Sequence, residues 1–254
     1  MQRHPLRVAG LALLMLAPLA ALMLLHDGPL MQDPAYHAFA DARRIQGIPH
    51  FANIVSNMPF LLVGCAGLWW CRRLDGTAAR SWRVFFAGVA LVTVGSAYYH
   101  AAPDDGALLW DRLPMAVAFM ALFAALLVEH LHLRRETVML LPALAIGVAS
   151  VLWWHWSGDL RFYVWVQGAP LLAIPYLVAA FPGKHLQRHV LLYGVGWYAL
   201  AKAAEFRDQE IWILTGGLIS GHSAKHLLAA AAAYCVLRML QRRAQSFTPV
   251  ASSQ

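Results

Sequence analysis

Apolar residues along this chain gather into long runs that short polar segments separate. A membrane-spanning helix needs about 20 mostly apolar residues, and eight runs approach or exceed this length. The pattern therefore predicts an all-α integral membrane protein. The predicted spans are residues 8–26, 51–71, 84–101, 108–129, 137–156, 162–181, 189–206 and 211–237.

The first run follows a basic N-terminus with Arg3 and Arg7, which is typical of a signal anchor or a secretory signal peptide. We expect an uncleaved anchor, because no clean A-x-A cleavage site follows it. Its removal would leave seven spans in the same orientation. The predicted organisation is an N-terminal hydrophobic helix at 1–31, an interfacial helix and loop at 32–50, a seven-transmembrane domain at 51–240 and a cytoplasmic tail at 241–254.

The composition supports the membrane assignment. Hydrophobic residues make up 60% of the chain and charged residues 13%, against about 25% charged in ordinary soluble domains. The net charge of +7 does not indicate a nucleic-acid partner, because the basic residues form short clusters between apolar runs. The three cysteines lie in or beside apolar runs without CxxC spacing, so we expect buried thiols and no disulfide framework.

Charge alternates from one loop to the next. The positive-inside rule places the basic loops, and with them both termini, in the cytoplasm. His100, Asp111 and His222 then fall at the extracytoplasmic ends of their helices. The basic loops contain Arg3, Arg7, Arg72, Arg73, Arg80, Arg83, Arg134, Arg135, Lys184, Arg188, Arg238, Arg242 and Arg243, and the other loops contain Asp33, Asp41, Asp104, Asp105, Asp159, Asp208 and Glu210.

His100, His222 and His226 lie within these spans, where an ionisable residue is costly and usually functional. His222 and His226 are four residues apart, so both imidazoles share one helix face and can bind one metal ion. His100, on another helix, would complete a site with three protein ligands and one open position, which is the catalytic form of zinc coordination.

Two further polar residues lie near His100 in the sequence. Ser96 is one helical turn before it, and the alternative role for this hydroxyl is a bond to a helix carbonyl. Asp111 follows after a tight turn and is either a general base or a partner of Arg112 or of a helix N-terminus. Lys225 is expected to lie off the histidine face, where it snorkels, pairs with Glu205 or Asp208, or holds an acidic lipid group.

Together these residues resemble the alkaline ceramidases, which belong to the CREST group of seven-helix membrane hydrolases. The order Ser96-x3-His100, Asp111, His222-x3-His226 matches that family. Two neighbouring segments also match the family. Asn53-x2-Ser56-Asn57 resembles the family's N-x-x-S-N segment, and the DRLPM segment that begins at Asp111 resembles the family's DELPM segment. The resemblance covers residues 50–237 and implies the seven-helix bundle of that family, here preceded by one extra hydrophobic helix.

The resemblance also implies a function. His100, His222 and His226 would bind zinc, Asp111 would act on the zinc-bound water, and Ser96 would hydrogen-bond the oxyanion. The expected reaction is hydrolysis of the N-acyl amide bond of ceramide or a related N-acyl membrane lipid to fatty acid and amine. The extra helix and DRLPM suggest a bacterial-type member in the inner membrane. The sequence does not specify an oligomeric state.

Calcium dependence is not expected. The related eukaryotic enzymes carry an acidic N-terminal segment for calcium, with a glutamate three residues before the asparagine, whereas His50 stands three before Asn53 here. Asp33, Asp41 and Asn53 are the remaining oxygen donors, and calcium takes six to eight oxygen ligands.

Two other functions fit the histidine pattern. An adiponectin-receptor-like receptor or sensor would use zinc mainly for structure. A transporter or redox protein would use the histidines for protons, metal transit or haem, although two histidines on one helix suit a bis-histidine haem poorly. A metal assay that finds one tightly held zinc ion without visible absorption would separate the zinc proteins from a transporter or a redox protein.

The charge pattern predicts that the C-terminal Arg242–Arg243 segment is cytoplasmic. A green fluorescent protein fused to the C-terminus should therefore fluoresce, and alkaline phosphatase fused there should be inactive. The reverse result would overturn the topology and the common depth of the site residues.

Overall fold

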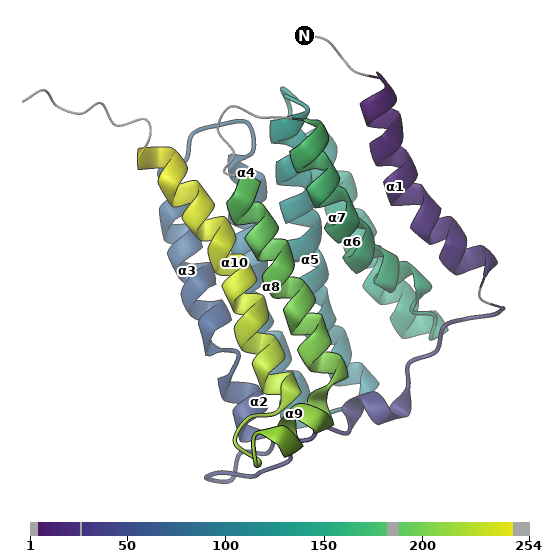
Figure 1. The fold of residues 1–254 in the computed structure, drawn as a ribbon, viewed down its shortest axis with the longest axis vertical. Helices are drawn as coiled ribbons and strands as arrows, with labels where there is room; N and C mark the ends of the chain where they lie inside the picture. Colours follow the sequence, from purple (N-terminus) through teal and green to yellow (C-terminus); the bar gives the residue numbers. More distant parts are fainter. Residues whose placement is uncertain (1–4, 26, 182–187, 246–254) are drawn as a thin grey trace, which may run out of the picture.

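The computed structural model describes residues 5–25, 27–181 and 188–245, and in this part of the chain every regular element is helical. The helices lie side by side in one bundle (Figure 1). Their bounds are α1 Pro5–Leu24, the 3₁₀ helix η1 Pro34–His37, α2 Phe51–Val55, α3 Met58–Cys71, α4 Ala79–Ala101, α5 Asp105–His130, α6 Thr137–Ser157, α7 Arg161–Ala180, α8 Arg188–Phe206, α9 Asp208–Leu214 and α10 Gly221–Gln245.

Six helical stretches in the described residues are long and apolar enough to cross a membrane: α1, α2 with α3, and each helix from α4 to α7. This confirms the prediction of an all-α membrane protein. α8 and α10 lie alongside these helices (Figure 1), and each contains at least three charged residues.

Two predicted spans are interrupted. The run 51–71 is broken between α2 and α3, and Pro59 lies in the first turn of α3. The single span predicted over 211–237 is wrong: Gly216 and Gly217 have φ values of 61° and 78°, a left-handed conformation that follows the end of α9. A new helix, α10, starts after Ser220, whose Oγ accepts the Ser223 N–H at 3.0 Å. α10 runs to Gln245 and so passes the predicted domain end at residue 240.

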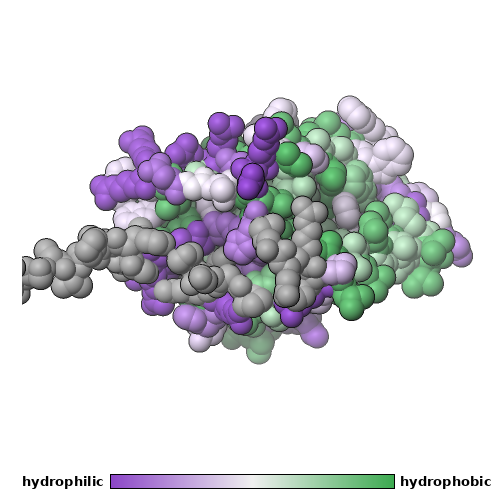
Figure 2. All heavy atoms as spheres, turned by 90° about the horizontal axis from the view of Figure 1, so that it is seen from above, coloured by the Kyte–Doolittle hydropathy of each residue, from purple (hydrophilic) through white to green (hydrophobic). Residues whose placement is uncertain are grey.

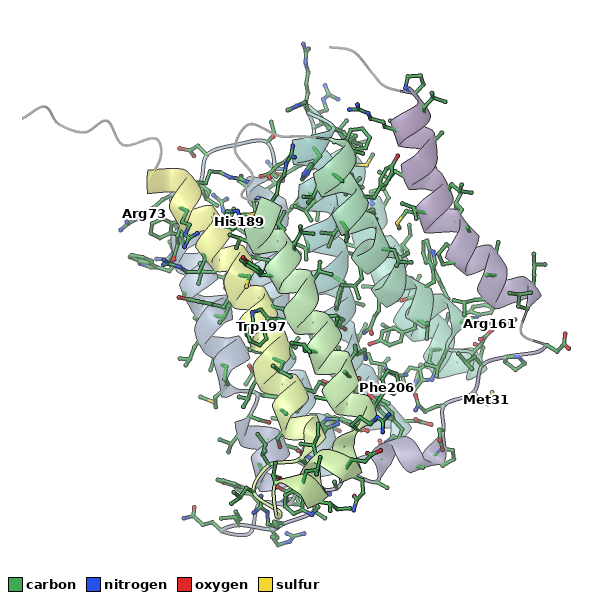
Figure 3. All side chains as sticks on the ribbon, viewed as in Figure 1. Met31, Arg73, Arg161, His189, Trp197 and Phe206 are labelled. Carbon is green, nitrogen blue, oxygen red and sulfur yellow. The ribbon has the colours of Figure 1, made fainter. Side chains whose placement is uncertain are left out.

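The two ends of the bundle carry different elements. The start of α1, the end of α10 and Arg73 of the α3–α4 connection lie at one end (Figures 1 and 3). Figure 2 looks onto this end and shows hydrophilic side chains there, with apolar atoms gathered towards the side of α1. η1, α2 and α9 lie at the opposite end, which we call the site end. Residues 27–50, called the strap below, cross the bundle at the site end.

The predicted N-terminal helix lies at the edge of the bundle, where α1 packs on α7. Trp165 Nε1 donates to the Met15 carbonyl at 2.6 Å, and the Tyr176 hydroxyl donates to the Arg7 carbonyl at 3.0 Å. Leu11 is the one buried residue of α1, so most of its surface is available to lipid. The seven-helix part that contains the site is formed without it.

α4 and α5 make the closest helix contact next to the predicted site. A Cβ atom on Gly95 of α4 would collide with the Trp110 carbonyl of α5 and lie 3.2 Å from the Asp111 Cα. The missing side chain therefore allows the two backbones to touch. This contact brings Ser96, the next residue of α4, beside Asp111.

We predict that Gly95→Ala lowers the free energy of unfolding by about 1–3 kcal/mol, because the added methyl overpacks this contact. Thermal unfolding of the purified protein in detergent measures this effect. The matched control is Gly168→Ala, since a Cβ at Gly168 meets nothing within 4 Å. A control variant as unstable as Gly95→Ala would refute the role of the close contact.

Candidate functional site

The three predicted histidines come together at the site end. His100 lies in the last turn of α4, and His222 and His226 lie in the first turns of α10. One ligand nitrogen of each lies within 4.8 Å of the others, and the Nε2 atoms of His100 and His222 are 3.2 Å apart. All three side chains are buried. Within the described residues, this is the one group of three or more His, Cys, Asp or Glu side chains arranged to hold a metal.

Hydrogen bonds fix the orientation of these imidazoles. The Ser56 hydroxyl donates to the Asn53 carbonyl at 3.1 Å and lies 2.8 Å from His226 Nδ1. Nδ1 must then carry the proton, which leaves His226 Nε2 as the free ligand atom. His50 Nδ1 lies 3.0 Å from the His100 carbonyl and ties the strap to the end of α4. Such contacts behind metal ligands set both tautomer and ring orientation.

The start of α10 is held by the Asn53-x2-Ser56-Asn57 segment. The buried Asn53 Oδ1 accepts from Ser223 Oγ at 2.7 Å and from Ser220 Oγ at 3.3 Å. Asp208 Oδ1 accepts the His222 N–H at 2.7 Å. At the far end of the same helix, Arg243 donates to Glu129 of α5 at 2.7 and 2.9 Å. α10 is therefore fixed in register at both ends.

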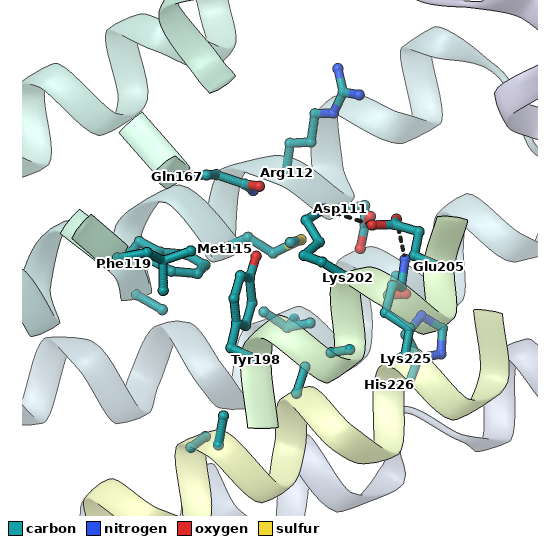
Figure 4. A pocket seen from close by; sticks show the side chains of 18 of the residues that line it. Asp111, Arg112, Met115, Phe119, Gln167, Tyr198, Lys202, Glu205, Lys225 and His226 are labelled. Atoms are coloured by element: carbon teal, nitrogen blue, oxygen red, sulfur yellow. Dashed lines mark hydrogen bonds and ion pairs between the residues drawn. The ribbon is translucent and has the colours of Figure 1, made fainter. Parts of the chain in front are cut away.

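Asp111 and Ser96 lie beside the histidines. Both are buried, both line the same cavity as His226, and the Ser96 hydroxyl interacts with the Asp111 carboxylate. Arg112 does not pair with Asp111: its guanidinium lies 4.0 Å over the Trp154 ring and points away from the carboxylate (Figure 4). Asp111 thus keeps a carboxylate directed at the site without an arginine partner.

A buried charge cluster next to the histidines was only partly anticipated. Glu205 binds Lys202 Nζ at 2.6 Å, Lys225 Nζ at 3.0 Å and the Tyr36 hydroxyl at 3.0 Å. This settles the open question of the Lys225 partner (Figure 4). The expectation that Lys225 lies off the histidine face is wrong, because its Nζ is 3.1 Å from His222 Nε2. The i,i+3 pair of Lys202 and Glu205 is the signal that sequence reasoning missed.

The strap covers the histidines. The Phe39 ring lies 4.6 Å, centroid to centroid, from both His100 and His222. The Leu30 N–H donates to Asp159 Oδ1 at 3.2 Å. Hydrogen bonds from Arg161 hold the pKa of the Asp159 carboxyl below its usual range, so this anchor remains charged. The strap therefore shields the metal-ligand group from the site end.

The oxygen donors considered for calcium have other partners. Asp33 accepts the Ala35 N–H at 2.8 Å, and Asp41 pairs with Arg43 at 2.6 Å. Asn53 is engaged by the serines of the α10 start. The expectation that activity does not need calcium stays a prediction.

A cavity of about 710 Å³ extends from the site into the bundle. At the site end it is lined by polar residues that include Asp111, Glu205 and Lys225, and Figure 4 shows these side chains near His226. Further in, Phe119, Met115 and other apolar side chains of α5, α7, α8 and α10 line it. The space can take a long apolar chain with its polar end at the histidines.

Comparison with known proteins agrees with this geometry. A family model described as Ceramidase matches residues 45–183, which include Ser96, His100 and Asp111. His222 and His226 lie beyond the matched residues. A comparison with curated proteins found no significant match.

We predict that Ser56→Ala weakens metal binding about 10–100-fold, the usual effect of removing a group that orients a ligand histidine. Competition with a chromophoric chelator measures the affinity. Ser157→Ala is the control, because the exposed Ser157 hydroxyl at the end of α6 donates to the Trp153 carbonyl and accepts the Asp159 N–H rather than contacting one of the three histidines. Unchanged affinity in Ser56→Ala would show that the Ser56–His226 contact does not orient a ligand.

Proposed function

The chain belongs to the ceramidase family of amide-bond hydrolases, and from this premise we propose that it hydrolyses an N-acyl lipid with a zinc ion held by His100, His222 and His226. The observation that carries the proposal is the convergence of three buried imidazoles and one carboxylate at the polar end of an apolar cavity.

The residues present fit zinc. Tetrahedral zinc with Zn–N bonds of about 2.0–2.1 Å requires ligand nitrogens about 3.3 Å apart. The Nε2 atoms of His100 and His222 are 3.2 Å apart. Ser56 occupies Nδ1 of His226 and so directs its Nε2 to the group. Three nitrogen ligands leave one position for water or substrate, as in catalytic zinc sites.

Zinc bound there would polarise the amide carbonyl and make a water molecule nucleophilic near neutral pH. Asp111 would accept a proton as the water oxygen bonds to the carbonyl carbon, and then pass it to the nitrogen as the C–N bond breaks. The Ser96 hydroxyl would donate to the oxygen that gains the charge. A fatty acid and an amine are the products.

The cavity supports an N-acyl lipid as the substrate. His226, Ala229, Ala233 and Val236 of α10 line it. His226 and Val236 are ten residues apart, which is about 15 Å along the helix, so an acyl chain would run along α10 with its amide at the histidines. Arg73, Arg242 and Arg243 lie at the bundle end opposite the histidines, and by the positive-inside rule this supports a site on the extracytoplasmic side of the membrane, which we propose is a bacterial inner membrane.

We predict that alanine at His100, His222 or His226 removes most of the zinc and abolishes release of fatty acid from N-acyl lipids. The three variants should be nearly equally inactive, because ligands of one ion act as a unit. Metal content per purified protein and fatty-acid release are the measurements. Full zinc and activity in His100→Ala would contradict the ligand set.

Asp111→Asn is the companion variant. It should keep its zinc and lose about 10²–10⁴-fold in turnover, the range for a general acid–base group. Loss of zinc in this variant would make Asp111 a ligand instead.

A further inference from the structure

The ammonium group of Lys225 lies at the edge of the metal-ligand group. Its Nζ is 3.1 Å from His222 Nε2, and that nitrogen is 3.2 Å from His100 Nε2. Lys225 also lines the cavity together with Ser96 and Asp111. A donor is therefore present on the α10 side of the site, in addition to the Ser96 hydroxyl on α4.

Glu205 holds this ammonium group in place. Its carboxylate accepts from Lys225 Nζ at 3.0 Å, and it is itself held by Lys202 at 2.6 Å and by the Tyr36 hydroxyl at 3.0 Å. The Lys225 and Glu205 side chains are 14% and 10% exposed. In such a poorly hydrated place, a fixed positive charge acts strongly on charge that develops nearby.

Metal binding would free an N–H of Lys225. The lone pair of His222 Nε2 can accept from Lys225 or bind a metal, but not both. An ammonium has three donors, and Glu205 accepts one of them. If His222 Nε2 binds the ion, it can no longer accept the Lys225 N–H that faces it. This N–H is then available to an oxygen atom in the open coordination position of the metal.

Resting on the proposed zinc-dependent function, we propose that Lys225 is a further catalytic residue, which donates a hydrogen bond to the scissile carbonyl oxygen as it becomes an oxyanion. When water oxygen bonds to the carbonyl carbon, the π pair moves to this oxygen, where Lys225 and Ser96 stabilise it. When the pair returns, the C–N bond breaks and the nitrogen takes the proton held by Asp111. Lys225 keeps its own protons throughout.

The chain offers a matched control in Lys202. This lysine binds the same carboxylate through the other oxygen and lines the same cavity. Its side chain is 37% exposed, and its described hydrogen bond goes to Glu205. Removing either lysine leaves Glu205 with the other one and with Tyr36, so the two variants perturb the charge cluster similarly.

The test compares Lys225→Met and Lys202→Met with the wild-type protein for zinc content, kcat, KM and inhibition by a phosphonate analogue of the substrate. Lys225→Met should keep its zinc and its KM, while kcat falls about 10²–10³-fold, as for loss of one oxyanion donor. The inhibition constant of the anionic phosphonate should rise by a similar factor. Lys202→Met should keep its zinc, and its kcat and phosphonate affinity should fall much less than those of Lys225→Met.

Three outcomes would overturn the proposal: unchanged kcat in Lys225→Met, loss of zinc in that variant, or equal losses in both lysine variants. None of these outcomes contradicts the zinc-dependent hydrolysis itself, because the zinc content and the activity of the wild-type protein are measured in the same experiment. If Lys225→Met does not fold, Lys225→Arg is measured in its place. We expect this variant to retain its zinc but to have a lower kcat and to bind the phosphonate more weakly.

Discussion

The structure depends on the requirement that polar groups buried among membrane-spanning helices find partners inside the protein. At the site end, nearly every helix contributes to meeting this requirement. Asn53 holds two serines at the start of α10, Ser56 holds His226, and Glu205 holds two lysines. Because these contacts also fix the directions of the imidazoles, the stability of this end and the geometry of the proposed metal centre have the same origin.

Under the proposed function, the strap and the cavity together would define how a lipid reaches the site. The Phe39 ring covers His100 and His222 at the site end, while the cavity continues among α5, α7, α8 and α10. A substrate that enters from the lipid side would place its acyl chain in the apolar part and its amide at the polar end. The proposed reaction would take place among largely buried side chains, where the electrostatic effect of Asp111, Ser96 and Lys225 is stronger than in water.

Much of this arrangement follows from patterns in the sequence. Apolar run length predicts the long helices, and the i,i+4 spacing of His222 and His226 predicts a shared face. The break at Gly216–Gly217 was not predicted, because the run 211–237 is apolar on average. Whether these glycines interrupt a helix depends on their φ values, which the composition of the run does not indicate. Lys225 was misplaced because a long side chain reaches beyond its own helix face. Phe39 lies far from the histidines in the chain, so local spacing carries no signal for its contact with them, whereas the i,i+3 spacing of Lys202 and Glu205 was a local signal for the charge cluster that was missed.

The proposed active site centres on one zinc ion bound by three imidazoles. X-ray absorption spectroscopy at the zinc edge of the purified protein tests this most directly, combined with metal analysis. We expect one zinc per chain with three nitrogen ligands at about 2.0–2.1 Å and one oxygen ligand. Sulfur ligands, a six-oxygen shell or a purified active enzyme without zinc would contradict the account.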